Sequence, residues 1–397
     1  MPLDLVDTLS QLVAIPSVNP MGRAVSGPEY YEYRVTEWLE KFFDRLGLPW
    51  QRTTVEPKRD NIVARLDGEI SPAAGGQILL LEAHQDTVPV DGMTIPPWTP
   101  TVRDGRIYGR GSCDIKGGMT AMLGALVKLV EERPRNRPTV IMACTVNEEH
   151  GYSGATALTK LWTSGGANSI IPRTPDAAII AEPTNLDVVV AHKGAVRWRC
   201  HTHGRAAHSS QPHLGDNAIY KMARVLQTLE RYASEVPQGL GSHPLCGRAT
   251  LSVGMISGGL SVNTVPARAT IEIDRRVIPG EETQACYEQV VDFVTRNCGL
   301  AEGVEHERPY LEGRSLADGP NLRLAERLAA AARPARGKSR LIGVPFGTDA
   351  ATIAGAGVPS VVFGPGSIAQ AHTCDEWLAL DELTLASEAI YRFAAGE

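Results

Sequence analysis

The sequence predicts an α/β fold in which a mostly parallel sheet is covered by helices on both faces, with an α+β domain inserted into it. Continuous apolar runs of strand length recur along the chain, and helical segments lie between them. In the interval 187–300 the pattern changes to alternating polar and apolar residues, which is typical of antiparallel strands. We therefore expect residues 1–186 and 301–397 to form one discontinuous domain and residues 187–300 to form the inserted domain.

The expected elements follow in chain order. A helix over 29–47 ends at Gly47, a residue that favours helix C-termini, and a second helix over 116–133 follows a glycine pair. The strands of the first domain are uninterrupted apolar runs, as expected for strands buried on both faces: 77–84, 139–146, 176–182 and 360–364. In the inserted domain, the alternating strands 249–259 and 267–280 follow a helix over 216–234.

Composition excludes several classes of protein. The 397 residues carry a formal net charge of −6, which gives no basic surface of the kind that nucleic-acid binding requires. The chain has no apolar run of membrane-spanning length, and its start lacks the basic segment of a secretory signal. The seven cysteines are scattered without a CxxC motif, so we expect free thiols in a cytoplasmic protein that binds neither nucleic acid nor a membrane.

Side chains that bind metals gather where the predicted strands end. They are His84, Asp86, Glu148, Glu149, Glu182 and, after the last strand, His372, with Asp114 in a glycine-rich turn that opens a helix. Taken singly, each has an ordinary explanation: a core histidine, a helix cap, a loop acid, or for His372 a surface ion pair with Asp375 or Glu376. Because the carboxyl ends of parallel strands meet at one edge, these acids together would concentrate negative charge there. One or two divalent cations are the natural neutraliser.

The ligand types indicate a catalytic site. Histidine and carboxylate ligands without cysteine suit catalytic zinc, cobalt or manganese better than structural zinc. In the stretch "TVNEEHG", one of the adjacent Glu148 and Glu149 can bind metal, and its neighbour then stands beside an activated water as a general base.

Six motifs, in this order along essentially the whole chain, resemble a family of two-zinc amidohydrolases and peptidases. They are "EAHQDTVPV", "GRGSCDIKGG", "NEEHG", "AEPT", "GRAAHSSQPHLGDNA" and "GPGSIAQAHTCDEW". The family includes acetylornithine deacetylase, succinyl-diaminopimelate desuccinylase, aminoacylase and glutamate carboxypeptidase. The resemblance implies a zinc-peptidase-like catalytic domain and makes the inserted domain a lid that mediates dimerisation.

The resemblance also implies roles for the clustered residues. His84, Asp114 and Glu182 would bind one metal ion, and Asp114, Glu149 and His372 the other, with Asp114 bridging.

Further roles follow from the same resemblance. Glu148 would be the general base, and Asp86 would orient His84. A cis peptide is expected after the bridging aspartate, at Asp114–Ile115.

The lid carries three further candidates by the same resemblance. His208 would stabilise the oxyanion, from its own or the partner subunit; the alternative is a surface histidine. Asn263 and Arg276 would hold the substrate carboxylate, to which the forked guanidinium of arginine is suited. The alternative for Arg276 is a surface salt bridge, and Arg275 takes its place if the strand register differs by one.

We expect a homodimeric metal-dependent hydrolase that cleaves the amide bond of an N-acyl amino acid, as acetylornithine deacetylase does in amino-acid biosynthesis. "FGTDAATIAG" places Thr348 and Asp349 near the substrate in this subgroup. Succinyl-diaminopimelate desuccinylase and the dipeptidases and carboxypeptidases of the family remain alternatives, because they share the metal ligands. A more remote alternative is a ligand-binding protein without catalysis on the same scaffold.

Overall fold

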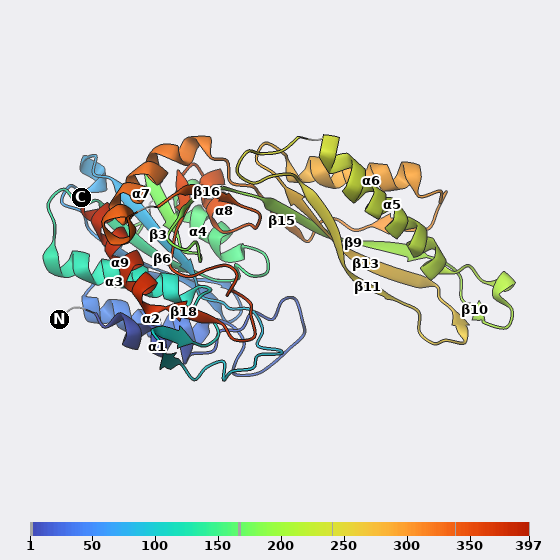
Figure 1. Ribbon diagram of the computed structural model, residues 1–397, viewed down its shortest axis with the longest axis horizontal. Helices are drawn as coiled ribbons and strands as arrows, with labels where there is room; N and C mark the ends of the chain where they lie inside the picture. The colour runs from blue at the N-terminus through green and yellow to red at the C-terminus, as the bar shows by residue number, and fades with distance from the viewer. Residues whose placement is uncertain (1–2, 166–167, 240, 338, 397) are drawn as a thin grey trace. The chain divides into compact units, whose positions relative to one another are not determined.

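The computed structural model describes residues 3–165, 168–239, 241–337 and 339–396, and it contains two compact units. The first comprises residues 1–190, 318–342 and 348–397; the second comprises residues 191–317 and 343–347. Each unit has its own sheet, with helices packed on it (Figure 1). Among the described residues, no helix has both the length and the apolar character needed to cross a membrane.

An eight-stranded sheet forms the centre of the first unit, in the order β1-β2-β6-β3-β7-β17-β8-β16. The bounds are β1 Trp50–Glu56, β2 Arg59–Leu66, β3 Ile78–His84, β6 Thr139–Thr145, β7 Ala177–Ile180, β8 Val188–His192, β16 Leu341–Val344 and β17 Ser360–Val362. The four strands predicted from continuous apolar runs are β6, β3, β7 and β17, which pair in parallel with their neighbours in this series. Antiparallel pairs flank them, β1 with β2, β2 with β6, and β17 with β8.

Two groups of helices cover this sheet. One group is α1 Leu5–Val13, α3 Lys116–Glu132, α7 Leu322–Arg336 and α9 Leu380–Ala395; the other is α2 Tyr33–Leu46, α4 Ser153–Thr163 and α8 Ala350–Gly355. The members of the first group pack on one another, and α3 packs on β6; α4 packs on β6 from the second group. Because every residue of β6 is buried, the helices cover both faces, and the predicted α/β class is confirmed.

Short elements complete the first unit. A three-stranded sheet joins β4 Thr101–Arg103, β5 Arg106–Tyr108 and β18 Trp377–Ala379 in the order β18-β5-β4. Two 3₁₀ turns are η1 Pro72–Ala74 and η3 Gly319–Asn321. Through the pairing of β18 with β5, the segment that follows His372 lies beside the segment that precedes Asp114.

The second unit is an antiparallel sheet in the order β11-β13-β9-β14, with β15 also paired to β9. Its strands are β9 Gly194–His203, β11 Thr250–Gly258, β13 Arg268–Val277, β14 Val304–His306 and β15 Leu311–Gly313. Helices α5 Ala218–Gly239 and α6 Thr283–Asn297 pack on one face and bury an apolar core that includes Trp198 and Tyr232 (Figure 1). The expected boundary at residue 300 falls before β14 and β15, which nevertheless pair with β9.

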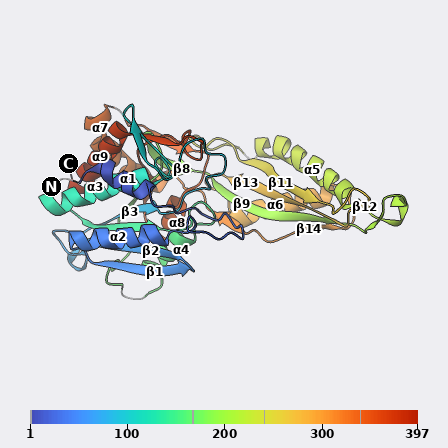
Figure 2. The same ribbon diagram turned by 90° about the horizontal axis from the view of Figure 1, so that it is seen from below.

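A small ribbon lies at one end of the second unit. It consists of β10 Ala207–His208 paired with β12 Thr264–Val265, beside the 3₁₀ turn η2 Pro212–Leu214. Figure 1 draws β10 at the end of the unit opposite β15, and Figure 2 draws β12 at that same end.

Candidate metal centre

The topology of the first unit brings the predicted ligands to one edge of its sheet. His84 is the last residue of β3, Glu149 follows β6, and Glu182 follows β7. Because β3 pairs in parallel with both neighbouring strands, their carboxyl ends meet, as expected for a ligand site in an open α/β sheet.

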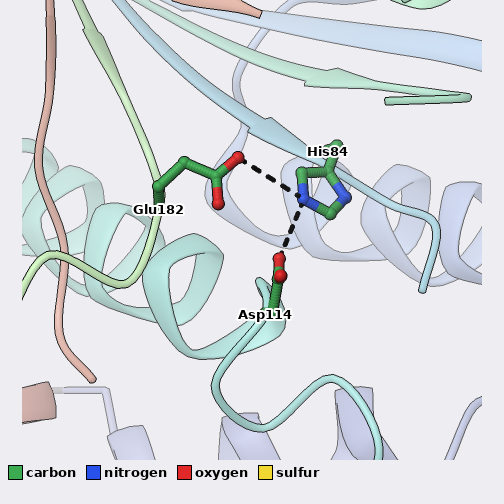
Figure 3. Close-up of side chains that lie close together, drawn as sticks. All are labelled: His84, Asp114 and Glu182. Atoms are coloured by element: carbon green, nitrogen blue, oxygen red, sulfur yellow. Dashed lines mark hydrogen bonds and ion pairs between the residues drawn. The ribbon is translucent and has the colours of Figure 1, made fainter. Parts of the chain in front are cut away.

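One group that could hold a metal ion consists of His84, Asp114 and Glu182. Figure 3 shows the three side chains converging, with His84 Nε2 3.2 Å from Asp114 Oδ1 and 3.9 Å from Glu182 Oε1. All three residues are buried.

The second group consists of Asp114, Glu149 and His372. His372 Nε2 lies 3.3 Å from Asp114 Oδ2 and 3.3 Å from Glu149 Oε2. The two oxygens of Asp114 thus face different histidines, which is the arrangement that a bridging ligand needs. The Asp114–Ile115 peptide is cis, as the sequence resemblance implied.

These side chains fit divalent cations. In a tetrahedral site, two ligand atoms that each lie about 2.0–2.1 Å from the ion are separated from each other by about 3.3 Å. Three of the four distances between ligand atoms given above are close to this value. Glu149 Oε1 is buried and has no hydrogen-bond partner. Burial and the charge of Asp114 raise the pKa of Glu149, and they raise the pKa of Glu182 well above its usual range. A cation in each group would satisfy these carboxylates.

Asp86 does more than its expected role of orienting His84. The Nδ1 of His84 lies 3.0 Å from the main-chain oxygen of Asp86 and 3.5 Å from its carboxylate Oδ1. The same carboxylate accepts the main-chain N–H groups of Glu148, at 3.1 Å, and of Glu149, at 3.2 Å. Burial alone would raise the pKa of Asp86, but the hydrogen bond and charge of His84 lower it to about 2. Asp86 therefore holds the loop that carries both glutamates.

Sequence reasoning missed a buried network that supports Asp86. Asn19 Nδ2 donates to Asp86 Oδ2 at 2.7 Å, and Asn19 Oδ1 accepts from Arg59 Nη2 at 3.2 Å. Arg59 in turn pairs with the fully buried Glu32 at 2.9 Å. Burial and the charge of Asp86 raise the pKa of Glu32 to about 8, against the lowering effect of Arg59. The one available signal was Asn19 itself, a polar residue in the apolar stretch "AIPSVNP".

Glu148 lies beside the two ligand groups without belonging to either. Its side chain is buried, and burial together with the charge of Glu182 raises its pKa well above the usual range. A buried carboxyl group that neighbours ligand candidates without joining them is in a position suited to a general base.

The loop before α8 places Thr348 and Asp349 in the interior. Thr348 is 3% exposed, and its Oγ1 accepts the N–H of Ala350 at 3.2 Å. Thr145 Oγ1 donates to Glu82 Oε1 at 2.5 Å and lies 3.2 Å from Asp349 Oδ2. The buried hydroxyl of Thr348 thus accepts a hydrogen bond from the first residue of α8, and its role toward a substrate stays a prediction.

The second unit separates its three candidate residues. His208 lies on β10 opposite Thr264, and the N–H of Ser209 donates to the main-chain oxygen of Asn263, so His208 and Asn263 are neighbours. Arg276 lies near the carboxyl end of β13, far from the end that follows Asn263 in the chain, and it pairs there with Ala195 of β9.

The register of β13 also separates the two arginines. Arg275 points inward, is fully buried and pairs with Glu281 at 2.8 Å. The side chain of Arg276 is 28% exposed and pairs with Asp274 at 2.8 Å. Of the two, Arg276 is the one accessible to a ligand.

The alternative in which His372 forms a surface ion pair with Glu376 is wrong. The carboxylate is fully buried and pairs with Arg110 at 2.6 Å. Four residues after His372, it resembles a loop acid in the sequence because its partner lies far away along the chain.

Comparisons with known proteins agree with this geometry. Residues 80–396, more than half of the chain, match the model of peptidase family M20/M25/M40. A probable succinyl-diaminopimelate desuccinylase of Staphylococcus aureus is 28% identical over 88% of this chain and 89% of its own. An acetylornithine deacetylase of Vibrio parahaemolyticus is 30% identical over 88% of this chain and 87% of its own.

Solved structures share the fold. A tripeptidase of Staphylococcus aureus, 23% identical, superposes with a TM-score of 0.76 over 99% of this chain and 98% of its own. A dinuclear metal-binding peptidase of Bacillus subtilis, 18% identical, gives a TM-score of 0.66 over 98% of this chain and 96% of its own. With the family match above, the chain belongs to peptidase family M20/M25/M40 and is a metal-dependent hydrolase.

Proposed function

We propose that this hydrolase cleaves the amide bond of an N-acyl amino acid, with two divalent ions bound at the paired ligand groups. One observation carries the proposal: two groups share Asp114, and the buried Glu148 stands beside them without joining either. Zinc is the metal we propose, with cobalt and manganese as alternatives, because the donors are imidazoles and carboxylates.

The ions would polarise the scissile carbonyl and lower the pKa of a water molecule. The residues of this chain do the rest. Glu148 takes the proton of the attacking water and returns it to the leaving nitrogen. The carboxylate of Asp86 accepts the main-chain N–H of Glu148 and so holds the base in one position. His208 donates to the developing oxyanion.

Arg276 and Asn263 are proposed to hold the substrate carboxylate, and Thr348 is proposed to lie near the substrate. Arg276 and Asn263 cannot serve one substrate from a single second unit. Arg268 and Arg276 lie at opposite ends of β13, eight residues apart, which is roughly 26 Å in an extended strand. Asn263 lies beyond the Arg268 end, next to His208. We therefore propose that two copies of the chain supply these groups.

A second copy also accounts for an exposed apolar edge. The edge strand β11 leaves one row of main-chain groups unpaired by the sheet, a natural place for another chain. Large apolar side chains stand exposed on it and on the loop that follows: Met255 64%, Ile256 62%, Leu260 99% and Val262 100%. Such a surface favours a homodimer formed through the second unit.

Two acyl groups are favoured by the relatives. An acetyl group on a diamino acid follows the similarity to acetylornithine deacetylase, and a succinyl group follows the similarity to the desuccinylase. Peptide substrates are supported by the peptidase family itself and by the fold shared with the tripeptidase. All of these substrates present an amide near a carboxylate, so the same catalytic groups serve each.

The test is release of amine from N-acetylornithine, N-acetylmethionine, N-succinyl-diaminopimelate and a dipeptide. Each is assayed with zinc or cobalt, after chelation, and after metal is restored, with Glu148→Ala as the inactive control. We expect one acylated amino acid to be cleaved in a metal-dependent manner. Two bound ions with no cleavage of any of these substrates would refute the proposed substrate class and favour the binding-protein alternative.

A further inference from the structure

Glu376 lies under the loop that carries Asp114. Its Oε1 accepts the N–H of Cys113 at 2.8 Å and the N–H of Asp114 at 3.0 Å. Its Oε2 accepts the N–H of Gly111 at 3.0 Å and Arg110 Nη1 at 2.6 Å. One fully buried carboxylate therefore binds three main-chain amides of a single turn, including the amide of the shared metal-ligand candidate.

Arg110 extends these contacts to the loop that carries His372. Its Nη2 lies 3.2 Å from the main-chain oxygen of Pro89 and 3.3 Å from that of Thr373, the residue after His372. The main-chain oxygen of Glu376 also accepts the N–H of Gly109 at 3.1 Å. The buried pair thus connects the segment before Asp114 with the segment around His372.

We propose that Glu376 is a positioning residue of the metal centre, which sets Asp114 through the three amides and His372 through Arg110. The inference rests on the proposed two-ion centre. Glu376 itself belongs to neither ligand group, so its effect on the ions is indirect. Groups that fix the orientation of metal ligands typically change metal affinity or activity by about 10-fold to 100-fold.

The contacts require a full carboxylate. Each oxygen of Glu376 accepts from two donors. A glutamine would turn its NH₂ group toward one of these pairs, whichever way its amide lies. Glu376→Gln therefore keeps the size of the side chain. Its NH₂ group, however, is a donor that faces two other donors, so the turn that carries Asp114 has to move.

The experiment measures metal affinity directly and does not depend on turnover. Purified parent and Glu376→Gln protein are titrated with cobalt in competition with a chelator of known affinity, and the visible absorption of bound cobalt is recorded. We expect both ions to bind about 10-fold to 100-fold more weakly in the variant, because Asp114 belongs to both groups. The cobalt absorption bands should shift, since the ligand geometry changes.

Asp187→Asn is the matched control. Asp187 is also a buried carboxylate of the first unit; it accepts the N–H of Arg340 at 3.0 Å and pairs with its guanidinium at 2.6 Å. It touches neither Asp114 nor His372, so the same chemical change should lower the melting temperature and leave cobalt affinity and spectrum at parent values.

Three outcomes are decisive. Parent-like affinity and spectrum in Glu376→Gln, with only a lower melting temperature as in the control, would overturn the role of Glu376 and leave the metal centre intact. A parent protein that binds no divalent ion would overturn the proposed function and this inference together. If Glu376→Gln does not fold, Arg110→Lys replaces it; we expect weaker binding of the ion at His372, and unchanged binding would overturn the role.

Discussion

Replacing Asp86 by asparagine tests how the catalytic loop is held. Asp86 Oδ1 accepts the N–H of Glu148, and Oδ2 accepts the N–H of Glu149 and the side chain of Asn19. An asparagine keeps one oxygen. In the orientation that loses the fewest hydrogen bonds, this oxygen takes the place of Oδ2 and keeps its two bonds. The NH₂ group of the asparagine then faces the N–H of Glu148. Asp86→Asn thus acts on the residue proposed as the general base.

The magnitude follows from that single lost bond. A buried N–H left without an acceptor costs about 1–3 kcal/mol, which corresponds to about 5-fold to 150-fold in an equilibrium or a rate. Loss of the negative charge beside His84 acts in the same direction, since that histidine would bind metal less strongly. We expect kcat/KM to fall by about 10-fold to 100-fold, mainly through kcat.

The assay is steady-state amine release at saturating metal, with bound metal measured in the same samples. Asp187→Asn makes the same chemical change at a remote site and should keep the parent kcat/KM. A kcat/KM for Asp86→Asn within about twofold of the parent would show that Asp86 does not position the base, and the reasoning from the two main-chain bonds would fail.

Glu148→Ala should retain both ions and lose about 100-fold to 10,000-fold in kcat, as measured by metal analysis and amine release; a loss below tenfold would refute its role as base. Met255→Lys combined with Ile256→Lys should give a monomer in sedimentation experiments, because both side chains are more than 60% exposed on the edge strand; an unchanged oligomer would place the interface elsewhere. His208→Ala mixed with Glu148→Ala should recover activity in mixed dimers if His208 acts across the dimer; no recovery in demonstrably mixed dimers would assign it to its own chain. Burial lowers the pKa of His192 from 6.5 to about 4, so the unfolded chain takes up a proton first and the free energy of unfolding falls by up to about 3 kcal/mol as pH drops from 6.5 to 4. Denaturant unfolding of the parent and His192→Gln should diverge in this range, and parallel pH profiles would contradict the assignment.

Local patterns are sufficient to predict the central strands and the cluster of ligands. Continuous apolar runs identify strands buried on both faces, and a parallel arrangement then brings their carboxyl ends together. For that reason the sequence alone places His84, Glu149 and Glu182 at one sheet edge, where the ligand groups lie. The orientation of neighbouring residues on a strand of the second unit follows from a different pattern, the alternation of side chains between the two faces of the strand. Arg275 falls on the face of β13 that also carries Ile271, Ile273 and Val277, so it is buried despite its charge, and Arg276 lies on the other face.

The sequence does not show which buried acids bind metal and which bind main-chain amides, and the reason is physical. A metal-binding carboxylate and a carboxylate that binds main-chain amides are the same chemical group in an apolar context. Asp86 holds the loop of Glu148 and Glu149, and Glu376 holds the turn of Asp114. Both are fully buried, and their partners lie far away in the sequence. Loops that must present ligands at fixed distances leave their own N–H groups without sheet partners, so additional buried acceptors are needed beside the ligands. An excess of acids at a strand edge therefore predicts both a metal centre and the groups that hold its loops, and only the contacts separate the two.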